Sequence, residues 1–365
     1  MPDSNLHNLS EAGVSVWLDY LSRQLIKSGK LEQMMRDDAV VGVTSNPTIF
    51  QKAISEGDAY DEQLKACLDE LTDPKEIFLN LSAEDVLEAC DLLRKVWDEG
   101  EGMDGYVSWE VDPTLAYDRE ATTAEATRLH EWIDKQNLYV KIPATEPGIG
   151  SIEDMVALGK NINITLIFSL ERYRQVVEAY IRGLERFADA GGDLSTMHSV
   201  ASFFVSRVDT AIDPALPEGS PLRGKAAVAN AKLAYQRLGE ILASERWQKL
   251  AQEGATAQRT LWASTGTKNP EYSDVLYVDE LIGPDCVNTM PEGTIAAFQD
   301  HGTVARTVDA DVEGARATVA ALAGAGVSLD DVTHKLEVDG VKSFSDSFDS
   351  LIGTIRQSLD AQRAA

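Results

Sequence analysis

A single lysine interrupts an otherwise apolar run at Leu138–Pro143 and points to amine chemistry. Lys141 stands between Val140 and Ile142, so the sequence predicts a strand that buries one ammonium group. Desolvation favours the neutral form of an amine, which is the form that attacks a ketone to make a Schiff base. A lysine in a strand is more often a side chain that reaches solvent or pairs with a carboxylate, so Lys141 alone leaves both interpretations open.

Two carboxylates follow other apolar runs in the same way. Asp19 comes directly after Val14–Leu18, and Glu110 comes directly after Tyr106–Trp109. Two carboxylates beside one amine can divide the acid and base steps of a reaction. Either one could instead cap the following helix or pair with a lysine. The hypothesis of catalysis therefore rests on the convergence of all three groups.

Other polar residues near the ends of apolar runs are candidates for binding a ligand. Asn46 lies in a polar turn that is either a binding loop or only the start of a helix. Asn163 and Thr165 share one face of a predicted strand, because side chains two residues apart point the same way. A buried amide and a buried hydroxyl on that face need partners or a ligand.

Arg207 and Lys268 follow two later apolar runs and are candidate phosphate anchors. A guanidinium binds phosphate in bidentate geometry, and barrels often hold phosphate near their last strands. The alternative for Arg207 is a salt bridge with Asp209 or Asp213.

The elements that must position these groups are short apolar runs that alternate with longer helical patterns, as in parallel βα units. The predicted strands are Val14–Leu18, Val40–Thr44, Tyr106–Trp109, Leu138–Ile142, Ile162–Ile167, Ser199–Phe204, Thr260–Ala263 and Cys286–Asn288. The predicted helical stretches include Ala83–Trp97, Thr122–Lys135, Leu170–Ala190, Arg223–Leu250, Val304–Ala323 and Phe344–Arg363.

Eight alternations predict a (β/α)8 TIM barrel, which takes about 250 residues and leaves roughly a hundred for additional helices. We expect one domain over residues 1–365, with extra N- and C-terminal helical segments. An open doubly wound sheet is the alternative, but its two commonest nucleotide-binding motifs are missing. In a barrel the carboxyl ends of the strands meet at one face, where the candidate residues would converge.

The composition limits the partners and the compartment. The 365 residues carry a net charge of -27, which disfavours nucleic acid and anionic membrane surfaces as partners. Three widely spaced cysteines and five unclustered histidines indicate neither a disulfide framework nor a metal site. No signal peptide or membrane-spanning run is evident, so the cytoplasm is the expected location.

Five blocks of the sequence, in order, resemble the transaldolases, and specifically the longer form found in actinobacteria and related bacteria. The blocks are Gly42–Phe50, Val107–Pro113, Val140–Thr145, Asn161–Ser169 and Ala201–Asp209. The resemblance spans nearly the whole chain. It implies a (β/α)8 barrel that moves a three-carbon dihydroxyacetone unit between phosphorylated ketoses and aldoses of the pentose phosphate pathway, without a metal or organic cofactor.

The resemblance also implies roles for the candidate residues. Lys141 would form the imine, Asp19 would move the proton of the C4 hydroxyl, and Glu110 would act through a water held by Thr165. The dihydroxyacetone and phosphate ligands that carry over are Asn46, Asn163, Ser202, Arg207 and Ser264. Shorter transaldolases have a second phosphate arginine where this chain has Gly266, and Lys268 is the expected substitute.

Two other functions remain open from the sequence. A Schiff-base aldolase that releases free dihydroxyacetone would use the same lysine and carboxylates. A catalytically silent sugar-phosphate-binding barrel is disfavoured because Asp19, Glu110 and Lys141 are all present. The sequence leaves open whether the chain is a monomer or a homodimer.

Overall fold

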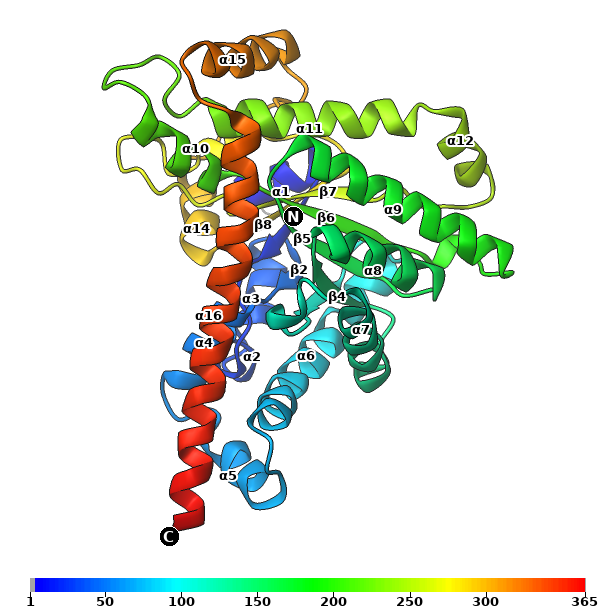
Figure 1. Ribbon diagram of the computed structural model, residues 1–365, viewed down its shortest axis with the longest axis vertical. Helices are drawn as coiled ribbons and strands as arrows, with labels where there is room; N and C mark the ends of the chain where they lie inside the picture. The colour runs from blue at the N-terminus through cyan, green and yellow to red at the C-terminus, as the bar shows by residue number, and fades with distance from the viewer. Residues whose placement is uncertain (1–3, 365) are drawn as a thin grey trace.

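Eight parallel strands close into a barrel in the computed structural model, which describes residues 4–364 (Figure 1). Each strand pairs with its neighbour in sequence, and β8 closes on β1. The strands are β1 (Val14–Leu18), β2 (Val40–Thr44), β3 (Tyr106–Glu110), β4 (Leu138–Pro143), β5 (Ile162–Ile167), β6 (Ser199–Phe204), β7 (Arg259–Ala263) and β8 (Cys286–Met290). The predicted (β/α)8 barrel is confirmed, and each predicted strand agrees with the observed one to within two residues at either end.

Helices surround the barrel (Figure 1). Those up to β5 are α1 (Asn5–Glu11), α2 (Arg23–Lys27), α3 (Lys30–Asp37), α4 (Pro47–Ser55), α5 (Asp61–Glu70), α6 (Pro74–Glu99), α7 (Arg119–Ile133) and α8 (Glu146–Ala157). Those after β5 are α9 (Leu170–Asp189), α10 (Ser206–Ile212), α11 (Ala226–Leu242), α12 (Glu245–Gln252), α13 (Leu276–Asp279), α14 (Glu292–His301), α15 (Val312–Gly324) and α16 (Leu329–Ala364). Short 3-10 turns lie at η1 (Pro113–Leu115), η2 (Leu194–Thr196) and η3 (Asp213–Ala215).

Four predicted helical stretches are wrong in their extent. Ala83–Trp97 and Phe344–Arg363 cover only the later parts of α6 and α16, which begin at Pro74 and Leu329. The stretch Arg223–Leu250 is split into α11 and α12, because the Ser244 side chain accepts a hydrogen bond from a backbone amide and starts a new helix. The stretch Val304–Ala323 is helical only from Val312, where Asp311 caps α15. Capping residues inside an apolar pattern thus mark a break that periodicity alone does not show.

The last helix, α16, runs past the barrel in Figure 1, from below α15 to the opposite end of the molecule. It packs against α4, α6, α10, η1 and the end of β5. Arg172 and Glu337 form an ion pair of 3.1 Å, and the hydroxyls of Thr48 and Ser347 lie 2.8 Å apart. These contacts hold α16 over the ends of the strands, where Phe344 enters the barrel mouth.

The opposite end of the barrel is filled by aromatic and charged side chains. The rings of Tyr106 and Tyr139 stack at 3.9 Å, and Trp17 packs beside Tyr139. Below them, the buried Arg259 guanidinium pairs with Asp104 at 3.0 Å. The amino-terminal face of a barrel usually serves stability, and this packing is a fixed floor under the polar residues above it. Within residues 4–364, no helix has both the length and the apolar character needed to cross a membrane.

Candidate active site

A cavity of about 180 Å³ lies at the carboxyl ends of the strands. Eight of the ten predicted site residues line it, namely Asp19, Asn46, Lys141, Thr165, Ser202, Arg207, Ser264 and Lys268. The other two, Glu110 and Asn163, are buried beside or behind these residues. The barrel thus brings together residues that are spread over most of the chain.

Lys141 is almost fully buried and is held by two groups. Its Nζ lies 3.0 Å from Oε2 of Glu110 and donates a hydrogen bond of 2.8 Å to the carbonyl of Ser45. The pairing follows from register, because Glu110 on β3 lies opposite Lys141 on β4. Burial raises the pKa of Glu110, and the nearby Lys141 opposes that shift. A carboxylate with a raised pKa is a good acceptor for the proton that an attacking amine must lose.

Glu110 and Thr165 have unused hydrogen-bonding capacity. Apart from the ion pair with Lys141, neither carboxylate oxygen of Glu110 has a partner within the described chain, and the same holds for the Thr165 hydroxyl. Buried polar atoms are nearly always hydrogen-bonded to protein, water or ligand. These atoms therefore have the capacity to bind a water or a substrate oxygen beside Lys141.

Asp19 is oriented by a chain of two hydroxyls. Thr44 Oγ1 donates to Asp19 Oδ1 at 2.7 Å and lies 2.6 Å from Thr289 Oγ1. Because a hydroxyl has one proton to donate, Thr289 donates to Thr44 and Thr44 to Asp19. Burial raises the pKa of Asp19, while the charge of Lys141 and then the Thr44 hydrogen bond oppose the shift. Sequence reasoning missed Thr289, because the predicted strand stops at Asn288, before this residue.

Asn163 lies behind Ser202 instead of lining the cavity. Ser202 Oγ donates to Asn163 Oδ1 at 2.7 Å, and Asn163 Nδ2 donates to Ser108 Oγ at 3.0 Å. Asn163 therefore positions Ser202, and its direct contact with a substrate stays a prediction. Asn46 fits both alternatives for its turn: it caps α4 by accepting from the amide of Ile49 at 3.0 Å, and it lines the cavity.

Arg207 is free of the salt bridge considered from the sequence. Asp209 accepts hydrogen bonds from the Ala227 amide and the Tyr277 hydroxyl, and Asp213 is likewise occupied by other groups. Arg207 lies over the ring of Phe204 at 5.1 Å. Throughout residues 4–364, no carboxylate forms an ion pair with it.

The charged residues that line the cavity are three cations and one carboxylate. Lys141, Arg207 and Lys268 face Asp19, in a chain whose net charge is -27. Lys268 forms no ion pair within the described residues, so two cations are available for an anionic ligand. Ser264 extends this rim, with its Oγ 3.0 Å from Ser206 Oγ and its backbone in the left-handed region at φ 56°. The rim matches a phosphate group in charge and in hydrogen-bond donors.

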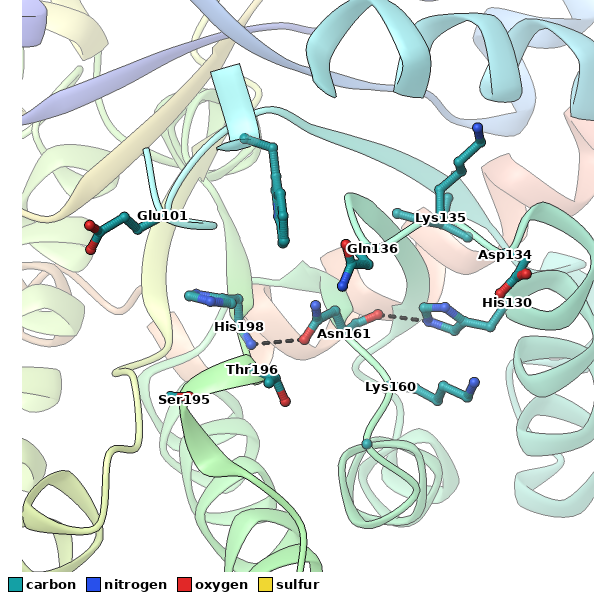
Figure 2. Close-up of a pocket in the computed structure, with 13 residues that line it drawn as sticks. Glu101, His130, Asp134, Lys135, Gln136, Lys160, Asn161, Ser195, Thr196 and His198 are labelled. Atoms are coloured by element: carbon teal, nitrogen blue, oxygen red, sulfur yellow. Dashed lines mark hydrogen bonds between the residues drawn. The ribbon is translucent and has the colours of Figure 1, made fainter. Parts of the chain in front are cut away.

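A second, larger pocket lies at the amino-terminal ends of the strands and lacks this charge (Figure 2). Figure 2 shows His198 and His130 on either side of Asn161, which bonds to both. Burial lowers the pKa of each histidine to about 4, so both are neutral near pH 7. The lysines and the carboxylates that line this pocket are equal in number. It therefore lacks the excess of positive charge that the first cavity has.

A closed (β/α)8 barrel with a buried lysine, two carboxylates and unpaired cations at its carboxyl face defines a Schiff-base enzyme that acts on anionic carbonyl substrates. Residues 16–355 match the family described as Transaldolase/Fructose-6-phosphate aldolase, and the chain belongs to that family.

Relatives named transaldolase are similar over nearly their whole length. The chain is 50% identical to the transaldolase of Frankia alni over 360 residues, which covers 97% of each protein. It is 50% identical to that of Thermobifida fusca, covering 98% of this chain and 99% of the relative. It is 48% identical to that of Mycolicibacterium smegmatis, covering 98% of each. These matches confirm the resemblance to transaldolases, including the link to actinobacteria.

Proposed function

We propose that this protein is a transaldolase of the non-oxidative pentose phosphate pathway. It transfers a dihydroxyacetone unit from sedoheptulose 7-phosphate to glyceraldehyde 3-phosphate, giving erythrose 4-phosphate and fructose 6-phosphate. The observation that carries the proposal is the pairing of Lys141 with the buried Glu110, at the wall of a cavity that Asp19 and two unpaired cations also line. The unpaired cysteines, Cys67, Cys90 and Cys286, agree with a location in the reducing cytoplasm.

The first step is imine formation on Lys141. The amine transfers its proton to Glu110, 3.0 Å away, and attacks the ketone carbon of the donor. Loss of the former ketone oxygen as water then needs a proton, which Glu110 returns through a water bound by Thr165. The buried and unused oxygens of both side chains support this route. The positively charged imine is an electron sink for the next step.

Asp19 carries the proton in the second step. Its carboxylate removes the proton of the donor C4 hydroxyl, the C3–C4 bond breaks, and its electron pair moves into the imine to give an enamine on Lys141. The aldose phosphate leaves and an acceptor aldehyde enters. The enamine carbon attacks the aldehyde carbon, and Asp19 returns its proton to the new hydroxyl. Hydrolysis of the imine releases the product ketose and restores the amine.

The remaining cavity residues would hold the substrate. Ser202, fixed by Asn163, and Asn46 are placed to bond the hydroxyls of the dihydroxyacetone unit. Arg207 and Lys268 would bind the phosphate, with Ser264 as a further donor at the same rim. These assignments rest on the position of each side chain around the cavity.

Release of glyceraldehyde 3-phosphate from fructose 6-phosphate, with and without erythrose 4-phosphate, tests the proposal. A transaldolase releases it continuously only when the acceptor is present, and sedoheptulose 7-phosphate then accumulates. Equal release without acceptor would instead identify an aldolase that frees dihydroxyacetone. No release in either case would indicate a silent binding barrel.

A further inference from the structure

The wall of the active-site cavity includes one residue from the last helix. Phe344 of α16 lines the cavity together with residues from the strand ends, and its side chain is 3% exposed. The centre of its ring lies 5.8 Å from Nζ of Lys141 and 6.0 Å from Cζ of Arg207. It thus sits between the reacting amine and the expected phosphate end of the substrate.

The helix is shaped to approach the barrel closely at this point. A Cβ on Gly340, one turn before Phe344, would lie 2.9 Å from the side chain of Leu166 at the end of β5. Glycine at this position therefore allows α16 to lie against the strand end. The Arg172–Glu337 ion pair and the Thr48–Ser347 contact hold the helix on both sides of Phe344. Phe344 is accordingly a fixed part of the site.

From these contacts we infer that Phe344 determines the reaction specificity of the enzyme. It shields the enamine on Lys141 from bulk water, so that the enamine reacts with an acceptor aldehyde and is not protonated. The inference rests on the proposed transaldolase function. The side reaction that it limits is protonation of the enamine carbon by a water-derived proton, followed by attack of water on the imine carbon. That sequence breaks the carbon–nitrogen bond, restores the Lys141 amine and releases free dihydroxyacetone. An apolar ring beside the amine keeps bulk water away from the enamine carbon and so limits its protonation, while the water bound by Thr165 remains for forming and hydrolysing the imine.

The test compares Phe344→Ala with the unmodified chain in fructose 6-phosphate, with and without erythrose 4-phosphate. We expect the ratio of acceptor-independent to acceptor-dependent release of glyceraldehyde 3-phosphate to rise at least about tenfold, equal to a lowering of the hydrolysis barrier by about 1.4 kcal/mol relative to transfer. In heavy water, the dihydroxyacetone released by the variant should carry one carbon-bound deuterium. This label reports enamine protonation directly.

Two further variants separate shielding from general damage. Phe344→Leu keeps apolar bulk over the amine and is expected to restore most of the acceptor dependence. Phe348→Ala removes an aromatic one turn further along α16 that packs edge-to-face on Phe78 at 5.6 Å and does not line the cavity. It is expected to lower the melting temperature without changing the release ratio.

The outcomes distinguish this inference from the proposed function. If the unmodified chain depends on the acceptor and Phe344→Ala depends on it equally, the shielding role is wrong and the transaldolase function stands. The shielding role is also wrong if Phe348→Ala raises the release ratio as much as Phe344→Ala does. If the unmodified chain already releases glyceraldehyde 3-phosphate continuously without acceptor, both proposals are wrong.

Discussion

Replacing Thr44 with valine removes the hydrogen bond that orients Asp19 while keeping the shape of the side chain. Thr44 is 2% exposed and donates to Asp19 Oδ1 at 2.7 Å. A hydrogen bond to a charged group contributes about 1.5–3 kcal/mol, and each 1.36 kcal/mol in a barrier is about tenfold in rate. We therefore expect kcat for transfer to fall by roughly 10- to 150-fold. Because valine fills the same space, the fall in kcat reflects the missing hydroxyl and not a packing defect.

The same substitution should move the pH profile. Burial already raises the pKa of Asp19, and the Thr44 hydrogen bond partly offsets that shift. Its removal raises the pKa further, so less of Asp19 is ionised at a given pH. Since the ionised carboxylate is the base in carbon–carbon cleavage, the acid limb of kcat moves to higher pH.

The assay follows steady-state transfer from fructose 6-phosphate to erythrose 4-phosphate between pH 5 and 9. Thr44→Ser keeps the donor and is the matched control, expected to stay within about threefold of the unmodified chain. Thr289→Val leaves the Thr44–Asp19 bond in place and is expected to have an intermediate effect. Wild-type kcat and an unshifted acid limb in Thr44→Val would show that Asp19 does not depend on this hydroxyl or is not the base.

Three other substitutions probe the site and the barrel floor. Asp19→Ala is expected to form the imine on Lys141 but to lose carbon–carbon cleavage. Borohydride should then trap the donor on the enzyme although no glyceraldehyde 3-phosphate is released. Release at the wild-type rate would contradict the role of Asp19. Lys268→Ala is expected to raise KM for a phosphorylated ketose by about tenfold, because a lost hydrogen bond to a charged group costs about 1.5 kcal/mol or more. Activity on unphosphorylated fructose, which has no phosphate to bind, is expected to stay unchanged. An equal effect on both substrates would show that Lys268 does not bind the phosphate. Arg259→Leu breaks the ion pair with Asp104 at the amino-terminal end of the barrel and is expected to lower the free energy of unfolding by about 3 kcal/mol. This is the lower end of the range for breaking a buried ion pair, because the Asp104 side chain is 22% exposed. Urea unfolding measures this loss, and a change under about 1 kcal/mol, as for a surface pair, would contradict the expectation.

Much of the barrel can be predicted because its strands are buried on both faces. Runs such as Ile162–Ile167 are largely apolar and lie between helical patterns, so their type and order are clear from the sequence. Helix breaks are harder to place. The break before α12 depends on one hydrogen bond from a backbone amide to Ser244, which hydrophobic periodicity does not register.

In the site, too, residues marked by a local sequence pattern could be predicted, and residues placed by contacts distant in sequence could not. Lys141, Glu110 and Asp19 stand at strand ends, and closing the barrel brings such ends together. Phe344 escapes sequence reasoning because nothing local distinguishes one aromatic in an amphipathic helix from another. Thr289 escapes it because the predicted strand stops at Asn288, one residue too early. Their roles depend on α16 crossing the barrel mouth and on β8 pairing beside β1. Such contacts, distant in sequence, leave no periodic signal.

Borohydride trapping of the donor on the enzyme tests Schiff-base chemistry on Lys141 most directly. Mass spectrometry then locates the modified residue. We expect fructose 6-phosphate and borohydride to leave one reduced adduct, on Lys141, and Lys141→Ala to show neither adduct nor turnover. An adduct on another lysine, or full transfer activity in Lys141→Ala, would contradict the assignment of Lys141 as the Schiff-base residue.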